Sequence, residues 1–230
     1  VFDRKEDSAE VGGDPPASDR TIYPSPQRIR RVFEELGPTF VKLGQLMSTR
    51  ADIFPAEYIE ELRKLQDRVP PIPFPEIQKV IEKELKRPIE EIFAELDKTA
   101  FAAASVAQVH HATLPNGEKV VVKVIRPAIM KKIREDIRLM YYIADKIEKS
   151  FDVGRILAPS NLVKEFERTI FKEIDMLIEA GSIEKFAYNF RDIDELYIPK
   201  VYWDYTTKSI LVMERIDGIK MDRVDELKTH

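Results

Sequence analysis

Apolar residues recur every three or four positions along the first part of the chain, which is the spacing of one face of an α-helix. Four stretches between Gln27 and Leu96 follow this spacing, and several begin at proline, which is favoured in a first helical turn. The stretches are PQRIRRVFEEL, PTFVKLGQLMSTR, PAEYIEELRKLQ and PFPEIQKVIEKELKR. The run VPPIPFP at 69–75 holds too many prolines for a helix and predicts a stiff connector. We therefore expect an all-helical first segment.

The second of these stretches, residues 38–50, carries a glycine in its interior. Gly44 lies between Lys42 and Gln45, where glycine costs a helix about 1 kcal/mol relative to alanine. Some other benefit of the glycine has to offset that cost.

Alternating apolar and polar positions replace the helical spacing from Ala103 onward. The run AASVAQVHHATLPNGEKVVVKVIRP reads as two strands joined by a turn at Pro115, Asn116 and Gly117. Asn-Gly between two β-rich runs is a strong signal for a β-hairpin. The second segment of the chain therefore begins with a hairpin.

Two long helical stretches follow the hairpin, from Pro127 to about Ser150 and from Pro159 to about Phe186. The run LYIPKVYWDYTTKSILVMERIDG then predicts two further strands around Thr206 and Thr207. The order of helices, hairpin, two helices and hairpin indicates an α+β fold.

The strand VVVKVIRP carries a lysine on a largely apolar face. Alternation places Val121, Lys123 and Ile125 on one face of the strand and the other valines on the opposite face. A buried ammonium group is costly without a partner, so three options remain for Lys123. It pairs with a carboxylate, it binds an anion such as phosphate, or its tip reaches solvent at a sheet edge.

Two other features bear on that choice. Three consecutive alanines and a serine, in FAAASVAQVH, precede the strands. Small side chains let a backbone approach a phosphate closely. Such runs of alanine, however, more often mark tight packing. Downstream, KEFERTIFKEIDMLIEAGS carries Glu173, Asp175 and Glu179. On one regular helix Asp175 and Glu179 share a face and Glu173 does not, so at most a subset of the three carboxylates pairs with Lys123. Alternatively, the three carboxylates form a solvated acidic face of the helix.

Composition excludes several classes of function. The 37 basic and 41 acidic residues give a net charge of −4 without a basic block, so we expect no nucleic-acid partner. Cysteine is absent and there are three histidines, which leaves no convincing metal set. No stretch is long and apolar enough to span a membrane.

Residues 1–26 are rich in glycine and proline and are expected to form a flexible lead-in.

The order of a small-residue loop, a lysine strand, a helix glutamate and further strands is that of a protein-kinase amino-terminal lobe. The sequence resembles the UbiB family of atypical kinases through five segments between Arg28 and Met221. They are KLGQ at 42–45, AAASVAQVH at 102–110, VVVKVIRP at 120–127, KEIDMLIEA at 172–180, and YIPKVYWDY with LVMERIDGI at 197–219.

The resemblance implies a helical extension at 27–100 that packs on a kinase-like amino-terminal lobe at 101–216, an antiparallel sheet with a long αC-type helix. Lys42 and Gln45 match the family's KxGQ signature, whose helix covers the nucleotide cleft, and Gly44 would permit close approach to the lobe. Glu179 would pair with Lys123, and Glu173 or Asp175 would meet the KxGQ segment. The expected nucleotide contacts are Ala102, Ala103, Ala104, Ser105, Val106, Ala107, Lys123, Glu214 and Ile216, the last two lying at the hinge where Arg215 also falls.

The resemblance also implies ATP or ADP with Mg²⁺ as cofactor, with quinone biosynthesis or isoprenoid lipid handling as the wider role. Residues 217–230 would begin a second lobe, and the chain carries neither the catalytic-loop Asp and Asn nor an Asp-Phe-Gly motif. We therefore expect a fragment that is inactive alone and whose metal ligands lie in the missing lobe. The expected location is the cytoplasm or the cytoplasmic side of a membrane.

Two other hypotheses remain. The lobe could be a non-catalytic nucleotide-binding or scaffold module. Alternatively, the helices from Gln27 to Arg87 could form a lipid-binding module, although apolar helix faces are mostly core and the many acidic residues disfavour an anionic surface.

Overall fold

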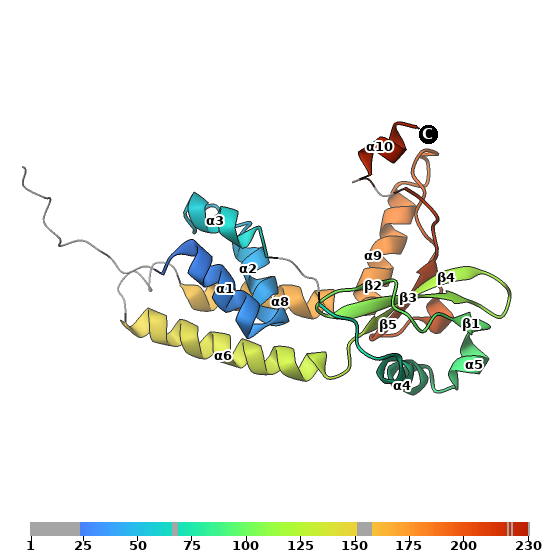
Figure 1. The fold of residues 1–230 in the computed structure, drawn as a ribbon, viewed down its shortest axis with the longest axis horizontal. Helices are drawn as coiled ribbons and strands as arrows, with labels where there is room; N and C mark the ends of the chain where they lie inside the picture. Colours follow the sequence, from blue (N-terminus) through green and yellow to red (C-terminus); the bar gives the residue numbers. More distant parts are fainter. Residues whose placement is uncertain (1–23, 66–68, 151–157, 220, 222, 230) are drawn as a thin grey trace, which may run out of the picture.

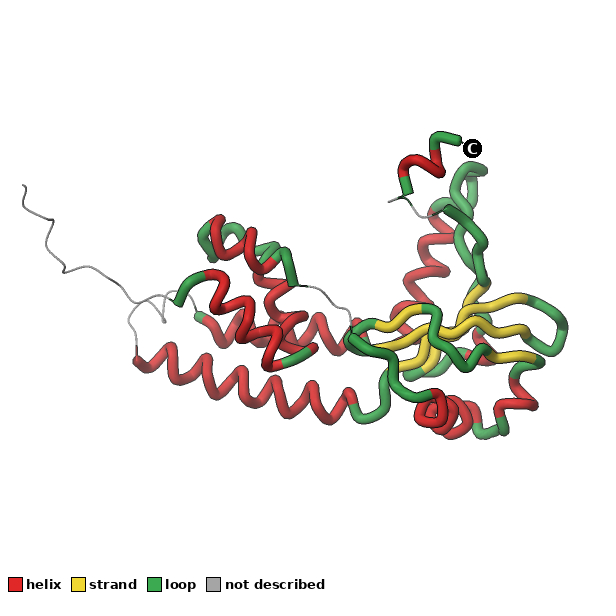
Figure 2. The backbone as a smooth tube through the Cα atoms, viewed as in Figure 1, coloured by secondary structure: helices red, strands yellow, loops and turns green. Residues whose placement is uncertain are grey.

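The computed structural model describes residues 24–65, 69–150, 158–219, 221 and 223–229. Most of the expected flexible lead-in, residues 1–23, lies outside the described residues. Helices make up one half of the molecule, and a sheet with further helices makes up the other half (Figures 1 and 2).

Three short helices at the start of the described chain pack on one another. They are α1 (Pro26–Leu36), α2 (Pro38–Met47) and α3 (Ala56–Leu62). Gly37 joins α1 to α2 with a φ of 100°, a left-handed conformation that favours glycine. Val41, Leu62 and Leu65 are buried between the three helices.

The second half of the molecule is built on an antiparallel sheet. Its strands are β1 (Glu95–Leu96), β2 (Ala102–Ala103), β3 (Ala107–Thr113), β4 (Lys119–Ile125) and β5 (Ile210–Glu214). The order is β1-β3-β4-β5, and β2 also pairs with β3. The predicted hairpin is confirmed as β3 and β4, with Gly117 in the left-handed region at the turn.

Alternation along β4 places its side chains in two different environments. Val120, Val122 and Val124 are fully buried under α4 (Phe74–Leu85) and α5 (Ile89–Ile92), which cover that face of the sheet. Lys123 lies on the other face, as the sequence predicts. The side chains on the two faces of the sheet therefore have different surroundings.

A second apolar cluster connects the two halves. The long helices α6 (Ile129–Ser150) and α8 (Pro159–Glu173) lie side by side and contact α2, while α9 (Met176–Asn189) packs against β5. The cluster runs from Phe40 of α2 through Ile133 and Ile170 to Leu211 of β5. Because one continuous core spans both halves, the helical extension is fixed on the lobe, and the predicted α+β fold is confirmed (Figure 1).

Three elements differ from the prediction. The first segment, expected to be helical to Leu96, ends in strand β1, which pairs with β3. The single helix expected from Pro159 to about Phe186 is broken at Ile174 and Asp175 into α8 and α9, because Asp175 caps a new helix. The first strand expected before Thr206 is absent from the described residues. Its place holds one bridge, between Val201 and Met213, and the 3₁₀ turn η1 (Trp203–Tyr205).

Gly44 packs inside the helical extension, so the expectation that it brings α2 close to the lobe is wrong. A Cβ atom at this position would lie 2.3 Å from Leu65 Cδ1 and 2.7 Å from Phe33 Cδ2, both of which belong to the extension. The glycine therefore allows α1 and the end of the α3 region to pack closely on α2.

Gly44→Ala is expected to destabilise the protein by about 1 kcal/mol, because the overpacking of Leu65 and Phe33 outweighs the gain in helix propensity. Gly181→Ala is the matched control, since Gly181 also lies inside a helix and has no atom within 4 Å of an added Cβ. That variant should stabilise the protein by up to about 1 kcal/mol. Urea unfolding measures both changes, and equal effects of the two substitutions would contradict the packing argument.

Candidate functional site

Lys123 forms an ion pair across the face of the sheet that α9 covers. It lies opposite Leu211 of β5 and Val109 of β3, so its side chain leaves the middle of the sheet. Its Nζ is 2.9 Å and 2.8 Å from the two carboxylate oxygens of Glu179. The bidentate contact satisfies the ammonium group, which is partly buried among apolar neighbours.

The start of α9 fixes the position of Glu179. The Asp175 carboxylate accepts a hydrogen bond from the Leu177 N–H, which is the bond of an N-cap. The Met176 N–H donates to the Lys208 carbonyl, and the Met176 side chain is fully buried. Glu179 follows in the first turn of α9, where a carboxylate is also favoured by the helix dipole.

A second lysine binds a carboxylate on the other side of the helix break. Lys42 of α2 donates to Glu173, the last residue of α8, at 2.5 Å. Because of the break, Glu173 is oriented by α8 and Glu179 by α9, and each reaches a different lysine. These contacts match the expected division for Glu179 and Glu173, while Asp175 caps α9 instead.

Gln45 does not reach the site. Its amide donates to the Leu65 carbonyl at 3.3 Å, within the helical extension. The expectation that Gln45 faces polar partners in the nucleotide cleft is therefore wrong in this structure. Lys42 and Gln45 are three residues apart on α2, yet one contacts α8 and the other contacts the end of the α3 region.

The alanine-rich segment forms a tight turn rather than an open loop. Ala102 and Ala103 pair as strand β2 with Val109 and Gln108 of β3, and the Ala104 N–H donates to the Ala107 carbonyl at 2.9 Å. The remaining residues of the turn, Ser105, Val106 and Ala107, have buried side chains. Val106 and Ala107 could therefore contact a nucleotide through their backbone groups but not through their side chains.

The residues expected at the hinge follow the end of β5. The Glu214 carboxylate accepts hydrogen bonds from the Tyr197 hydroxyl at 2.6 Å and from the Lys200 N–H at 3.2 Å. The bond to Glu214 raises the pKa of the Tyr197 phenol above its ordinary value. The Glu214 N–H is also bonded, to the Lys200 carbonyl, and Ile216 beyond it is exposed.

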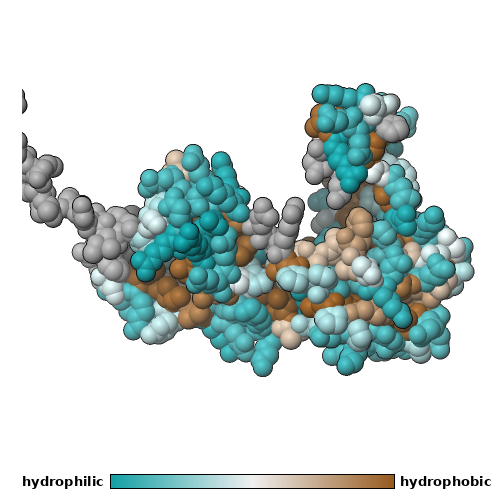
Figure 3. Space-filling view, viewed as in Figure 1, coloured by the Kyte–Doolittle hydropathy of each residue, from teal (hydrophilic) through white to brown (hydrophobic). Residues whose placement is uncertain are grey.

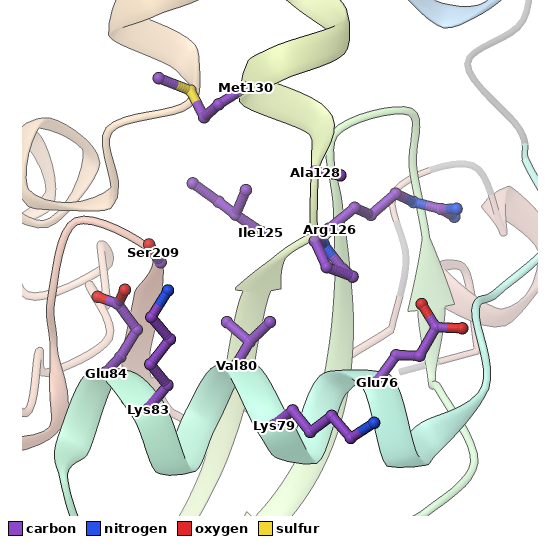
Figure 4. A pocket seen from close by; sticks show the side chains of 11 residues that line it. Glu76, Lys79, Val80, Lys83, Glu84, Ile125, Arg126, Ala128, Met130 and Ser209 are labelled. Carbon is purple, nitrogen blue, oxygen red and sulfur yellow. The ribbon is translucent and has the colours of Figure 1, made fainter.

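A cavity of about 690 Å³ lies elsewhere in the described part of the molecule. It is bounded by α4, the end of β4 and Ser209, as Figure 4 shows, and none of the predicted site residues lines it. Its walls carry both Lys79 and Lys83 and Glu76 and Glu84, so no single charge dominates. In the described ranges no three His, Asp or Glu side chains are grouped in a way that could hold a metal ion.

Sequence reasoning missed two residues beside the alanine-rich turn. Arg126 donates to the Ala104 carbonyl and to the Pro70 carbonyl of the connector. The buried Gln108 accepts from the Ile72 N–H at 3.0 Å. The glutamine could have been noticed as a polar residue on an inward-facing position of a strand, but its connector partner is 36 residues away.

An antiparallel sheet with a strand lysine bound to a helix glutamate, next to a small-residue turn, defines a kinase-like amino-terminal lobe. A family model described as the ABC1 atypical kinase-like domain matches residues 64–230. The chain belongs to this family.

Curated relatives agree with the assignment. The chain is 48% identical over 212 residues to a protein of Marinobacter nauticus named "Probable protein kinase UbiB", and 44% identical over 203 residues to one of the same name from Cellvibrio japonicus. These matches cover 90% and 86% of this chain but only 39% and 37% of the relatives.

A solved structure is also similar. It is described as a complex of Rv3197 with erythromycin from Mycobacterium tuberculosis. The TM-score is 0.56 at 26% identity, and the match covers 85% of this chain and 49% of the other. The family assignment and the fold therefore agree.

Asp175→Ala is expected to cost about 1 kcal/mol of unfolding free energy, because it removes the cap that starts α9. Asp175→Asn keeps an N-cap acceptor and should cost much less. Thermal unfolding followed by circular dichroism compares the two variants. If Asn and Ala were equally destabilising, the carboxylate would act by its charge and not as a cap.

Proposed function

We propose that the chain is the ATP-binding part of an atypical kinase or ATPase of the UbiB type. The observation that carries the proposal is the Lys123–Glu179 ion pair, which forms beside the alanine-rich turn in a lobe that belongs to a kinase-like family. In kinases the strand lysine binds the α- and β-phosphates and the helix glutamate orients it. Phosphoryl transfer by the whole protein is part of this proposal.

The roles of the individual residues follow from their contacts. Lys123 would donate to phosphate oxygens while Glu179 holds its ammonium group in place, so little reorganisation is needed on binding. Ala102, Ala103 and Ala104 would let the backbone approach the phosphates, and the backbone at Glu214 and Ile216 would meet the adenine ring.

The Lys42–Glu173 pair would hold the helical extension beside the start of α9. Any contribution of this pair to stability is reduced by solvent, because the Glu173 side chain is 39% exposed. Its proposed task is therefore positional: it keeps α2 next to the residues that carry Glu179.

Mg²⁺ would accompany the nucleotide. A bound Mg²⁺ neutralises charge on the β- and γ-phosphates and supports in-line transfer. In kinases the protein ligands of the metal come from the second lobe, and we propose the same for the whole protein here. Lys123 and the turn would bind and orient the phosphates, and they would not hold the ion.

The wider role we propose is in ubiquinone biosynthesis or the handling of isoprenoid lipids, at the cytoplasmic side of a membrane or in the cytoplasm. The relatives' name UbiB supports the role in ubiquinone biosynthesis.

A largely apolar cavity lies between α1 and α3. Its volume is about 510 Å³, and Met47, Phe54 and Tyr58 are among the residues that line it. The cavity supports the proposal that the protein binds an apolar ligand. No helix in the described ranges is long and apolar enough to cross a bilayer. Failure of the full-length protein to cosediment with phospholipid vesicles would refute a membrane location.

Lys123→Met is expected to weaken binding of Mg-ATP at least about tenfold, since it removes the charge that faces the phosphates. Lys131→Met is the control, because Lys131 is an exposed lysine of α6 with only a distant contact of 3.9 Å to Glu135. Calorimetric titration of the chain and of the full-length protein gives both dissociation constants. Equal affinity of Lys123→Met and the unmodified protein would exclude this nucleotide site.

A further inference from the structure

Arg126 bonds to both sides of the alanine-rich turn. It is the first residue after β4, and its backbone N–H donates to the Val106 carbonyl at 2.9 Å. Its side chain donates from Nε to the Ala104 carbonyl, also at 2.9 Å. A single residue therefore holds the backbone of the turn at two carbonyls that lie two positions apart.

The same guanidinium group reaches the proline-rich connector. Its second nitrogen, Nη2, donates to the Pro70 carbonyl at 2.8 Å. Figure 4 shows the Arg126 side chain running away from Ile125 and Lys83, toward the coil that leads into α4. Because a guanidinium is planar and its donors are fixed relative to one another, it holds the Ala104 and Pro70 carbonyls at a set separation.

A second contact ties the connector to the strand that follows the turn. The Gln108 side chain accepts from the Ile72 N–H at 3.0 Å and donates to the Ile72 carbonyl at 3.4 Å. Gln108 is fixed in turn by His110, whose Nδ1–H donates to the Asp97 carbonyl, which leaves Nε2 to accept from the Gln108 amide. Burial lowers the pKa of His110 and so favours the neutral ring that this arrangement needs.

The connector is therefore bonded at two points: Pro70 to Arg126, and Ile72 to Gln108 of the strand that follows the turn. Proline at positions 70, 71 and 73 restricts the backbone dihedrals of the connector, so its two contact points move together.

We infer that Arg126 is a positioning residue of the nucleotide site, which fixes the alanine-rich turn against the connector. This inference rests on the proposed nucleotide site. Alanine lacks the conformational freedom of glycine, and a turn held at both carbonyls is pre-formed for phosphate rather than closing around it. Arg126 acts through the turn and does not itself need to contact the nucleotide.

The test compares Arg126→Gln and Arg126→Lys with a control at Arg138→Gln. Arg138 is an exposed arginine of α6 that forms no side-chain hydrogen bond or ion pair with the described residues. The first measurement is amide hydrogen exchange at Ala104 and Ile72, with Val122 in the middle of β4 as the internal reference. The second measurement is the dissociation constant for Mg-ATP.

Arg126→Gln should speed exchange at Ala104 and Ile72 and leave Val122 unchanged. It should also weaken Mg-ATP binding about tenfold, because binding would then have to supply the free energy that orders the turn. Arg126→Lys keeps the charge but offers no planar fork, so it should restore only part of the affinity. Arg138→Gln should behave like the unmodified protein.

Three results would overturn the inference. The first is unchanged exchange at Ala104 together with unchanged affinity in Arg126→Gln. The second is faster exchange at Val122 to the same degree, which would make Arg126 a residue of general stability. The third is full recovery by Arg126→Lys, which would assign the effect to charge alone. Absence of Mg-ATP binding in the unmodified protein would instead refute the proposed function, and exchange at Ala104 would then decide separately whether Arg126 anchors the turn.

Discussion

The break between α8 and α9 determines where two carboxylates of the candidate site lie. Glu173 ends one helix and Glu179 lies in the first turn of the next, so each reaches a lysine from a different part of the chain. On one continuous helix Glu173 and Glu179 would lie about 120° apart around the axis, whereas the break lets each carboxylate be oriented by its own helix. The break is stable because Asp175 caps α9 and Met176 is both buried and hydrogen-bonded to the Lys208 carbonyl.

The two apolar clusters explain why this arrangement is rigid. One cluster lies under α4 and α5 and fills the face of the sheet that holds Val120, Val122 and Val124. The other continues from α2 through α6 and α8 to β5, so it crosses from the extension into the lobe. Figure 3 shows apolar surface at intervals along this side of the molecule, between hydrophilic regions. Lys123 lies on the face that the second cluster covers, and its position therefore depends on both halves of the molecule.

Much of the fold could be predicted from the sequence because its signals are local. The Asn-Gly turn and the alternation around Lys123 were sufficient to predict β3 and β4 and to assign their faces. The residues that pack against Gly44 could not be predicted in the same way, because Phe33 and Leu65 contact it only through tertiary packing. The helix break was missed because Ile174 and Asp175 fit a helical pattern. The cap forms because the Asp175 side chain bonds to the backbone in competition with the regular helix, and apolar spacing does not reveal that competition. The contacts of Arg126 were equally hidden, because Pro70 lies 56 residues away in the sequence.

Paramagnetic broadening by Mn²⁺-ATP would locate the nucleotide directly on this chain or on the full-length protein. If the site is the one argued above, the amide signals of Ala104, Lys123 and Ile216 broaden first, while those of Lys79 and Lys83 at the cavity beside α4 stay sharp. Broadening confined to Lys79, Lys83 and Ser209 would place the nucleotide on the opposite side of the sheet and would contradict the account.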